Sequence, residues 1–229
     1  MNIIKRLKKN TVGTDYFVGD IHGCYDLLMN RLAEIKFDTK KDRLISVGDL
    51  VDRGPDSIKC LGLLNETWFH AVMGNHEEMM YSVLNRLFPS STYIKNGGAW
   101  FLSEPPETQQ HFVDLSEEMM SLVIEVETDV GNIGVLHANA PDDWIVYSAV
   151  DDDAIDDSTL YDTTWGRDRI YGRHAGPVKN IDYVVVGHTP VNEVVNLDNI
   201  VYIDTGAVFK RPLTILTAKE VAQYANRAN

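Results

Sequence analysis

The chain has 229 residues, which is large for one domain but still within the range of a single domain with a full hydrophobic core. Its formal net charge of −13 argues against a nucleic-acid or anionic-membrane partner. No apolar run approaches the ~20 residues that a membrane span needs, and two cysteines alone argue against a disulfide framework. We therefore expect one domain, residues 1–229, in a soluble cytoplasmic protein.

The N-terminal residues are rich in lysine and arginine. Because no apolar h-region follows them, they do not have the pattern of a signal peptide. We expect residues 1–13 to form a flexible, solvated segment before the first strand.

Three short apolar runs in the first half of the chain each end in a motif rich in glycine and polar residues. The runs cover residues 16–18, 44–47 and 69–73 and are typical of buried strands. The motifs are Gly-Asp-Ile-His-Gly at 19–23, Gly-Asp-Leu-Val-Asp-Arg-Gly at 48–54 and Gly-Asn-His-Glu at 74–77. Their spacing is close to the roughly 30 residues of a strand, crossover helix and parallel strand. The motifs should therefore lie at the carboxyl ends of three adjacent parallel strands.

Helical patterns separate these strands. Apolar residues at helical spacing predict a crossover helix over residues 24–36. Pro55 is suited to open a second helix, and a third follows Asn75 and stops before Pro89. This β-α-β-α-β-α order predicts the α/β class.

The second half of the chain has a different pattern. Residues 90–118 are predicted to be helical in pieces and to rest over the site, and residues 121–127 and 132–136 to form a hairpin. Further strands are predicted at 183–186, 194–196, 200–203 and 213–216, giving a mainly antiparallel second sheet. The aspartate-rich stretch 151–157 is interpreted as a solvated loop, with a role in favouring basic substrates as the alternative.

Oxygen and imidazole ligands gather at the predicted strand ends. They are Asp20, His22, Asp49, Asn75, His137 and His188. Mixed nitrogen and oxygen ligation suits first-row divalent ions such as Mn, Fe or Zn and does not suit calcium. Six ligands serve two ions better than one if a carboxylate bridges them, and Asp49 is central in the series. The predicted assignment gives one ion Asp20, His22 and Asp49, and the other Asp49, Asn75, His137 and His188.

Such a dinuclear centre predicts phosphate ester hydrolysis. Two divalent ions roughly 3.5–4 Å apart can hold a bridging hydroxide, because metals lower the pKa of bound water toward ~7. With two aspartates and one hydroxide the centre keeps a net positive charge inside an acidic protein, so a phosphate group is a suitable guest. The predicted reaction is direct in-line attack of this hydroxide on phosphorus, without a phosphoenzyme.

Two arginines are candidates for binding the non-bridging phosphoryl oxygens. Arg53 and Arg167 are assigned this role, because guanidinium pairs bidentately with phosphate and stabilises charge in the transition state. Arg169 and Arg173 stand near Arg167 and remain open as alternatives.

An acid pair is predicted beside the metal ligands. His76 follows ligand Asn75 directly, so it should face the site without binding metal, and we assign it as the general acid for the leaving alkoxide. Asp52 is predicted to orient His76 and to stabilise its imidazolium form.

The motif series resembles the phosphoprotein phosphatase family of metallophosphoesterases, most closely its bacteriophage and bacterial members. Beyond the three glycine-rich motifs, the similarity includes His137-Ala138, Gly187-His188-Thr189-Pro190 and Ile203-Asp204-Thr205-Gly206-Ala207, and it runs from Tyr16 to about Leu216. It implies a calcineurin-like fold, a two-sheet β-sandwich flanked by helices, with two metal ions, usually manganese. It also implies hydrolysis of phosphoserine and phosphothreonine in proteins, and the same roles for all ten residues named above. Asn139 departs from the Gly or Asp that relatives often have, which affects local loop shape.

Two other functions remain open. Dinucleoside tetraphosphate hydrolases, of the symmetrical type, share the early motifs, but they commonly resemble Gly-Asp-Leu-Val-Ala-Arg-Gly and Gly-Asn-His-Asp. Asp52 and Glu77 therefore favour a serine/threonine protein phosphatase. The third function is a non-catalytic metal-binding scaffold, which the complete set of ligands with Arg53 and His76 disfavours.

Overall fold

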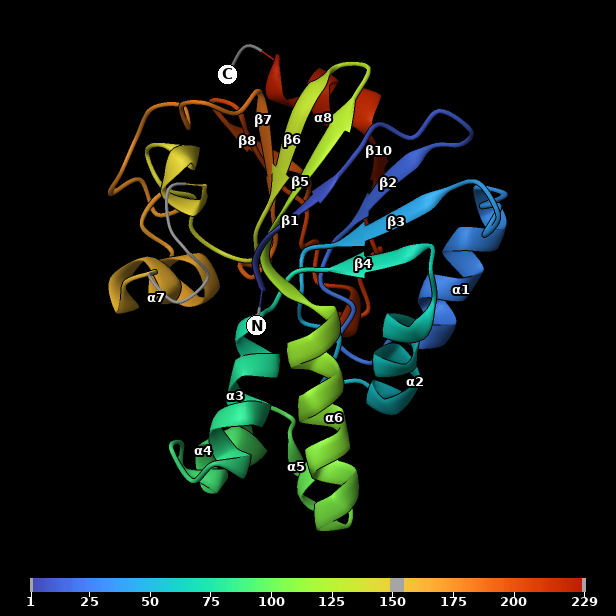
Figure 1. Cartoon of the computed structure of the whole chain (residues 1–229), viewed down its shortest axis with the longest axis vertical. Helices are drawn as coiled ribbons and strands as arrows, with labels where there is room; N and C mark the ends of the chain where they lie inside the picture. Colours follow the sequence, from blue (N-terminus) through green and yellow to red (C-terminus); the bar gives the residue numbers. More distant parts are fainter. Residues whose placement is uncertain (1, 149–154, 228–229) are drawn as a thin grey trace.

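The computed structural model describes residues 2–148 and 155–227. Two β-sheets, one of six strands and one of four, pack against each other, and helices flank them (Figure 1). This arrangement confirms the predicted mixed α/β sandwich. No helix formed by the described residues has an apolar stretch long enough to cross a bilayer.

The four-stranded sheet carries the three glycine-rich motifs. Strands β2 (Asp15–Val18), β3 (Arg43–Ser46) and β4 (Phe69–Ala71) are parallel neighbours, as predicted. Their crossovers contain α1 (Tyr25–Glu34), and α2 (Ser57–Gly62) followed by the 3₁₀ turn η1 (Leu63–Asn65). A fourth strand, β10 (Ile215–Thr217), adds antiparallel to β2, so the strand predicted at 213–216 belongs to this sheet and not to the second one. The motifs that follow β2, β3 and β4 therefore share one edge of this sheet.

The six-stranded sheet is mixed, so the prediction of a mainly antiparallel sheet was wrong. Three of its five neighbouring pairs are parallel, and only the β5–β6 and β8–β9 pairs are antiparallel. The long connection from β6 to β7, which contains α7 (Asp157–Trp165), allows the chain to return in the same direction. Its strands, in spatial order, are β1 (Asn2–Leu7), β5 (Ser121–Thr128), β6 (Gly131–Val135), β7 (Tyr183–Val186), β9 (Ile200–Tyr202) and β8 (Val195–Leu197).

The expectation of a flexible segment over residues 1–13 does not hold for Asn2–Leu7, which form strand β1. This strand lies at the edge of the larger sheet and pairs in parallel with β5. The basic residues that suggested a solvated segment face acidic residues of β5, with Arg6 Nε 3.9 Å from Glu125 Oε2 and Lys8 Nζ 3.7 Å from Glu127 Oε2. Ile3 is buried beneath them. Ion pairs with β5 and the buried side chain of Ile3 thus hold in place a segment whose basic sequence alone suggests a solvated one.

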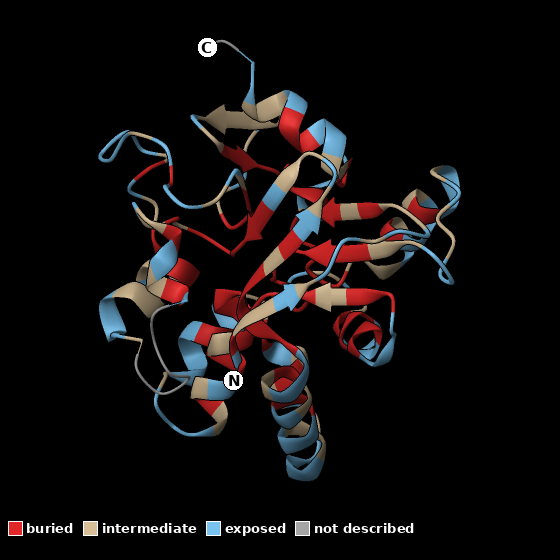
Figure 2. Ribbon diagram, turned by 45° about the horizontal axis from the view of Figure 1, so that its top comes forward, coloured by how far each residue is buried: buried red, intermediate tan, exposed pale blue. Residues whose placement is uncertain are grey.

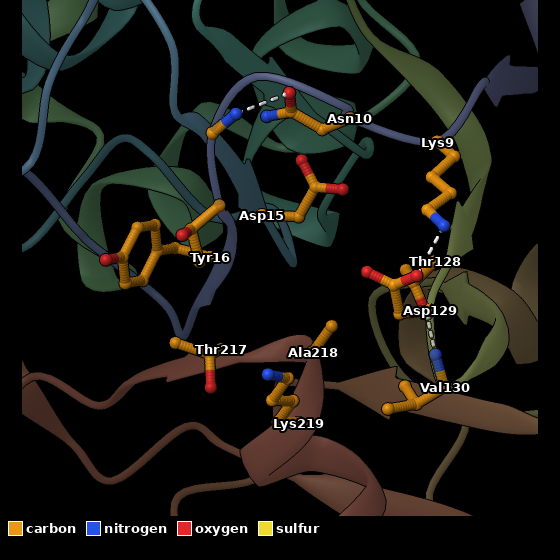
Figure 3. A pocket seen from close by; sticks show the side chains of 12 residues that line it. Lys9, Asn10, Asp15, Tyr16, Thr128, Asp129, Val130, Thr217, Ala218 and Lys219 are labelled. Atoms are coloured by element: carbon orange, nitrogen blue, oxygen red, sulfur yellow. Dashed lines mark hydrogen bonds and ion pairs between the residues drawn. The ribbon is translucent and has the colours of Figure 1, made fainter.

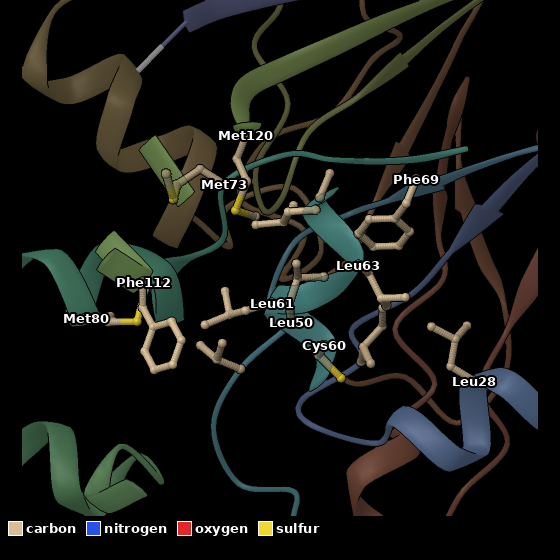
Figure 4. Close-up of a cluster of buried hydrophobic side chains, with 14 of the residues drawn as sticks. Leu28, Leu50, Cys60, Leu61, Leu63, Phe69, Met73, Met80, Phe112 and Met120 are labelled. Atoms are coloured by element: carbon tan, nitrogen blue, oxygen red, sulfur yellow. The ribbon is translucent and has the colours of Figure 1, made fainter. Parts of the chain in front are cut away.

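Helices cover the outer face of the four-stranded sheet. Helices α1, α2, α3 (Asn75–Leu84) and α6 (Pro106–Met119) contribute Leu28, Leu61, Met80 and Phe112 to the apolar cluster drawn in Figure 4. Residues 90–119 are helical in three pieces, as predicted, with α4 (Ser90–Lys95) and α5 (Ala99–Leu102) before α6. Their outward faces are exposed, whereas the strands are mostly buried (Figure 2).

Two short segments of the second half differ from the sequence interpretation. Residues 151–154 of the aspartate-rich stretch lie outside the described residues, but Asp156 is the N-cap of α7, where its carboxylate accepts a 2.9 Å hydrogen bond from the Thr159 N–H. A C-terminal helix, α8 (Ala218–Ala225), was not predicted, although Thr217 and Glu220 form the capping box that marks its start. The remaining 3₁₀ turns are η2 (Trp144–Tyr147) and η3 (Ala207–Phe209).

Replacing Ile3 by Ala tests whether β1 belongs to the folded protein. Ile3 is 3% exposed, so we expect Ile3→Ala to lower the free energy of unfolding by about 2–4 kcal/mol in denaturant titrations. Val12, 70% exposed in the β1–β2 connection, provides the control, and Val12→Ala should stay within about 0.5 kcal/mol of the parent. Equal stability of both variants would mean that β1 contributes nothing to the fold.

Candidate active site

The predicted metal ligands come together from both sheets. Asp20 and His22 follow β2, Asp49 follows β3, and Asn75 opens α3 after β4. From the larger sheet, His137 follows β6 and His188 follows β7. All six are buried, with at most 6% of any residue exposed. The sandwich therefore assembles one cluster from strand ends that lie up to 168 positions apart in the sequence.

Backbone strain marks this cluster. His22, Asp49 and His188 have positive φ angles of 45°, 51° and 65°. Asp52 and Arg53, in the turn after β3, have φ angles of 70° and 67°. Residues other than glycine rarely adopt this left-handed backbone conformation, and those that do concentrate at functional sites. Sharp turns at the strand ends thus direct the side chains toward a common point.

Asp49 lies at the centre of the cluster. Its Oδ1 is 3.4 Å from His137 Nε2, and its Oδ2 is 3.4 Å from His22 Nε2. The same Nε2 atom of His137 also lies 3.0 Å from Asn75 Oδ1 and 3.1 Å from His188 Nδ1. Although burial acts to raise it, the surrounding imidazoles hold the pKa of the Asp49 carboxyl well below its usual range. Asp49 is therefore a carboxylate shared by two sets of imidazoles.

The imidazoles present unprotonated nitrogens to one another. In each of His22, His137 and His188 one ring nitrogen donates to a backbone carbonyl, at Val51 (2.9 Å), Val47 (2.7 Å) and Trp165 (3.2 Å) respectively. The other nitrogen is then an acceptor that faces Asp49. Burial lowers the pKa of His22 to about 3, and burial with the neighbouring His137 lowers that of His188 to about 2, so both rings are neutral.

Acceptors that face one another at 3.0–3.4 Å without an intervening proton repel, and a cation removes this repulsion. Metal ligands must be neutral imidazoles or carboxylates, and a ligating histidine usually donates its second nitrogen to a carbonyl or carboxylate. The donor set therefore fits divalent metal ions, with two groups of candidate ligands that share Asp49, one completed by His22 and His76 and the other by His137 and His188.

A second carboxylate, Asp204, adjoins Asp20 and was not predicted as a site residue. Burial, followed by the nearby Asp204 and Asp49 carboxylates, raises the pKa of Asp20. Asp20 also accepts the backbone N–H of His188 at 3.1 Å. Asp204 lies two residues after the last residue of β9, at a strand end like the other acids, and this position is the signal that sequence reasoning passed over. Its negative charge strengthens the case for cations in the cluster.

The predicted acid pair is formed. His76 Nδ1 lies 2.6 Å from Asp52 Oδ2, and both side chains are fully buried. The other oxygen of Asp52 accepts from Tyr93 Oη at 3.1 Å and from Trp100 Nε1 at 2.7 Å. His76 Nε2 has no hydrogen-bond partner among the described residues and lies 3.9 Å from Asp49 Oδ2. The α4–α5 segment thus fixes Asp52, which fixes His76 with one free nitrogen toward the cluster.

The arginines near the site have different surroundings. Arg53 Nη1 donates to His22 Nε2 at 2.6 Å, at the edge of the cluster. Arg169 is a structural residue, because its buried guanidinium donates to the carbonyls of three residues and to the Asp142 carboxylate. Arg173 is exposed and pairs with Asp168. Arg167 is half-buried. Burial of the rings is the main cause that lowers the pKa values of His137 and His188, and the positive charge of Arg167 also lowers them. Of the three candidates, Arg167 is therefore the one beside the cluster.

Glu77 braces the central loop and was missed as a site residue. Its buried carboxylate accepts the N–H groups of Asp49 (3.1 Å), Leu50 (2.8 Å), Val51 (3.3 Å) and Gly74 (3.0 Å). Burial beside Asp49 raises the pKa of Glu77 to about 7, while these donors act to lower it. Asn139 has a similar bracing role, since its Oδ1 accepts the Arg169 N–H at 3.1 Å beside Arg167.

The sequence pattern of calcineurin-like phosphoesterases matches residues 16–192, which include all six predicted ligands, Asp52, Arg53, His76 and Arg167. The chain belongs to this family. Membership of a metallophosphoesterase family, together with the two ligand groups around Asp49, implies divalent metal ions at the site of this phosphoesterase.

Individual relatives agree with the family assignment. The phosphoesterase is 36% identical over 215 residues to serine/threonine-protein phosphatase 1 of Salmonella typhimurium, covering 93% of this chain and 95% of the relative. It is 32% identical over 136 residues to a symmetrical bis(5'-nucleosyl)-tetraphosphatase of Actinobacillus succinogenes, covering 58% of this chain and 47% of that one. Among solved structures, a candidate diadenosine tetraphosphatase aligns over 96% of this chain and 95% of its own with a TM-score of 0.68 at 20% identity, which confirms the calcineurin-like fold.

A cavity of about 340 Å³ lies apart from this cluster and shares none of its residues (Figure 3). It is lined by the β1–β2 connection, the β5–β6 turn and the start of α8. Its charged residues are largely satisfied within the protein, since Lys9 pairs with Asp129 and Asp15 binds Arg43 at 2.7 and 2.8 Å. None of the ten predicted site residues lines this cavity.

Replacing Glu77 by Gln tests the bracing of the central loop. The amide keeps the shape but directs an NH₂ group at backbone donors, so at least one buried N–H loses its acceptor. We expect Glu77→Gln to lower the free energy of unfolding by about 1–3 kcal/mol. Glu118→Gln, on an exposed position of α6, is the control and should change stability by less than about 0.5 kcal/mol. A neutral Glu77→Gln would contradict the assigned contacts.

Proposed function

We propose that the chain is a metal-dependent serine/threonine protein phosphatase, which hydrolyses phosphomonoesters on phosphorylated proteins or peptides. The observation that carries the proposal is the set of mutually facing acceptors around Asp49, bordered by Arg53 and by the free nitrogen of His76. The near full-length similarity to a serine/threonine-protein phosphatase supports the substrate class. The two cysteines are free thiols, which supports a cytoplasmic location, and ligands from both sheets support one catalytic domain over residues 1–229.

Two divalent ions are proposed, held as the sequence indicates. Asp20, His22 and Asp49 are assigned to one ion, and Asp49, Asn75, His137 and His188 to the other. When bound, such ions act as Lewis acids toward phosphate and supply a nucleophile from water near neutral pH. Manganese is the proposed metal, because it usually serves the bacterial members of the family that the motifs resemble. Nitrogen and oxygen donors in this mixture are also compatible with iron or zinc.

The chain's own cations are proposed to bind the phosphoryl group. Arg53 borders the cluster on the His22 side, and Arg167 on the side of His137 and His188. Guanidinium groups on two sides can hold the non-bridging oxygens and stabilise the charge that develops in the transition state. This placement orients the scissile bond relative to His76.

His76 is proposed as the general acid. Its Nδ1 is committed to Asp52, so its Nε2 is the atom that can donate a proton to the leaving seryl or threonyl oxygen. Asp52 stabilises the imidazolium form, and Tyr93 and Trp100 keep the Asp52 carboxylate in position. The leaving group departs as an alcohol, and the acid is restored by a proton from water.

A dinucleoside tetraphosphate hydrolase is the second candidate, favoured by the similarity to a bis(5'-nucleosyl)-tetraphosphatase over about half of the chain. Such a substrate is cleaved at an anhydride, whose phosphate leaving group needs no strong acid. The buried Asp52–His76 pair, with two further donors on Asp52, favours an ester with a poor leaving group.

Metal-stripped protein supplied with Mn²⁺ tests the substrate class. We expect manganese-dependent phosphate release from a phosphoseryl peptide and little cleavage of diadenosine tetraphosphate assayed beside it. Equilibrium dialysis should find two ions per chain at saturation. Cleavage of the dinucleotide alone would overturn the substrate class. Full activity with fewer than two ions per chain would overturn the model in which Asp49 bridges two ions. Hydrolysis of neither substrate would favour the scaffold function.

The leaving-group dependence of His76→Asn tests the acid assignment. Loss of a general acid costs roughly 10²–10⁴ in rate for an alkyl phosphate, whereas p-nitrophenyl phosphate, whose leaving group is weakly basic, needs less protonation. We expect kcat to fall far more for the alkyl substrate. An equal fall for both substrates would assign His76 a structural role, and an unchanged kcat for the alkyl phosphate would remove it from the mechanism.

A further inference from the structure

A groove runs between helices α3 and α7 and borders the candidate active site. It consists of two hollows of about 340 and 290 Å³, which share Glu78 and Ser82 of α3. We call it the α3–α7 groove and define it by Glu78, Ser82, Phe88, Glu117, Tyr161 and Trp165. Both helices have an end at the cluster, because α3 begins with Asn75 and α7 ends with Trp165.

Trp165 is shared by the groove and the active site. Its indole ring lies 6.5 Å, between centroids, from the ring of His188, and its carbonyl accepts from His188 Nε2 at 3.2 Å. Its Nε1 donates to Glu78 Oε2 at 2.9 Å, and Thr164 Oγ1 donates to the same oxygen at 2.9 Å. Glu78 therefore holds α7 against α3 and keeps one wall of the groove next to the catalytic cluster.

The groove combines aromatic faces with negative charge. Phe88, Tyr161 and Trp165 line one hollow, and Tyr161 is 60% exposed. Glu78 and Glu117 line the other, and no lysine, arginine or histidine of the described residues lines either hollow. The half-buried side chain of Glu117 has no hydrogen bond or ion pair with another described residue, so its charge is not compensated within the described part of the chain. Aromatic faces and carboxylates together suit a guanidinium group, which stacks on rings and pairs with acids.

We infer that the α3–α7 groove binds an arginine side chain of the substrate, close in sequence to the phosphorylated serine or threonine. The inference rests on the proposed protein phosphatase function, whose substrate preference it specifies. An extended peptide advances about 3.3–3.6 Å per residue, so a side chain one to three residues from the phosphorylated one reaches past Trp165 into the groove. The opposite charges of the two subsites match such a peptide, with the phosphate at Arg53 and Arg167 and the guanidinium at Glu78 and Glu117.

A set of phosphothreonine peptides tests the inference. The peptides are identical except for Arg, Leu or Glu placed one, two or three residues from the phosphothreonine on either side. Each kcat/KM with the Mn²⁺-loaded protein is divided by the value for p-nitrophenyl phosphate, which is too small to reach the groove. At one or more positions we expect Arg to exceed Glu by about tenfold, the size of one cation–π contact plus one exposed ion pair, with Leu between them.

Matched variants locate the effect. Tyr161→Ala and Glu117→Gln should each bring the Arg-to-Glu ratio toward unity. The controls are Tyr171→Ala, since Tyr171 is 59% exposed outside the groove, and Glu118→Gln, next to Glu117 on α6; both should keep the ratio of the parent. Equal values for all peptides, a preference for Leu, or a ratio unaffected by the groove variants would overturn the inference while peptide hydrolysis itself upholds the proposed function. No phosphate release from any peptide would overturn both.

Discussion

The structure of the site depends on a buried carboxylate, Asp49, surrounded by nitrogen lone pairs that cannot satisfy one another. Three imidazoles turn their unprotonated nitrogens inward because their other nitrogens are hydrogen-bonded to backbone carbonyls of the fold. In a medium of low dielectric such an arrangement is costly unless positive charge compensates it. The folding energy of the sandwich therefore holds a polar cluster in a form that is complete only with cations.

The surroundings of Asp49 explain why the chain folds its site from so many elements. Two of the carbonyl anchors, at Val47 and Val51, lie in the same loop as Asp49, so the position of that loop sets the orientation of His137 and His22. Glu77, on α3, holds this loop by accepting hydrogen bonds from the backbone N–H groups of the loop. Gly48 allows Gly74 to approach closely, since a Cβ atom on residue 48 would lie 2.8 Å from the Gly74 nitrogen. One helix N-terminal segment thus contains a predicted ligand, the proposed acid and the brace, and the geometry of all three is coupled.

The sequence predicted the site better than the sheets, for physical reasons. Residues such as Asp20, Asp49 and His188 follow buried apolar runs at turns that need glycine, and this local pattern survives without knowledge of the fold. The direction of β7 relative to β6 depends on where a long connection returns, and the pairing of β1 depends on acidic residues of β5 more than a hundred positions away. Glu77 was missed because nothing in its local pattern distinguishes a brace from a ligand, whereas Asp204 stands at a strand end, a signal that was present in the sequence and not used.

The pairing of β1 with β5 also sets an order on the synthesis of the chain. Asn2–Leu7 is synthesised long before its partner strand Ser121–Thr128, which is made only after the four-stranded sheet has all but one of its strands. During that interval the segment has an unpaired backbone and one apolar side chain, Ile3. Its lysines and arginines keep such an edge from pairing with other nascent chains. The basic side chains that later pair with β5 thus also disfavour aggregation of this segment before β5 has been synthesised.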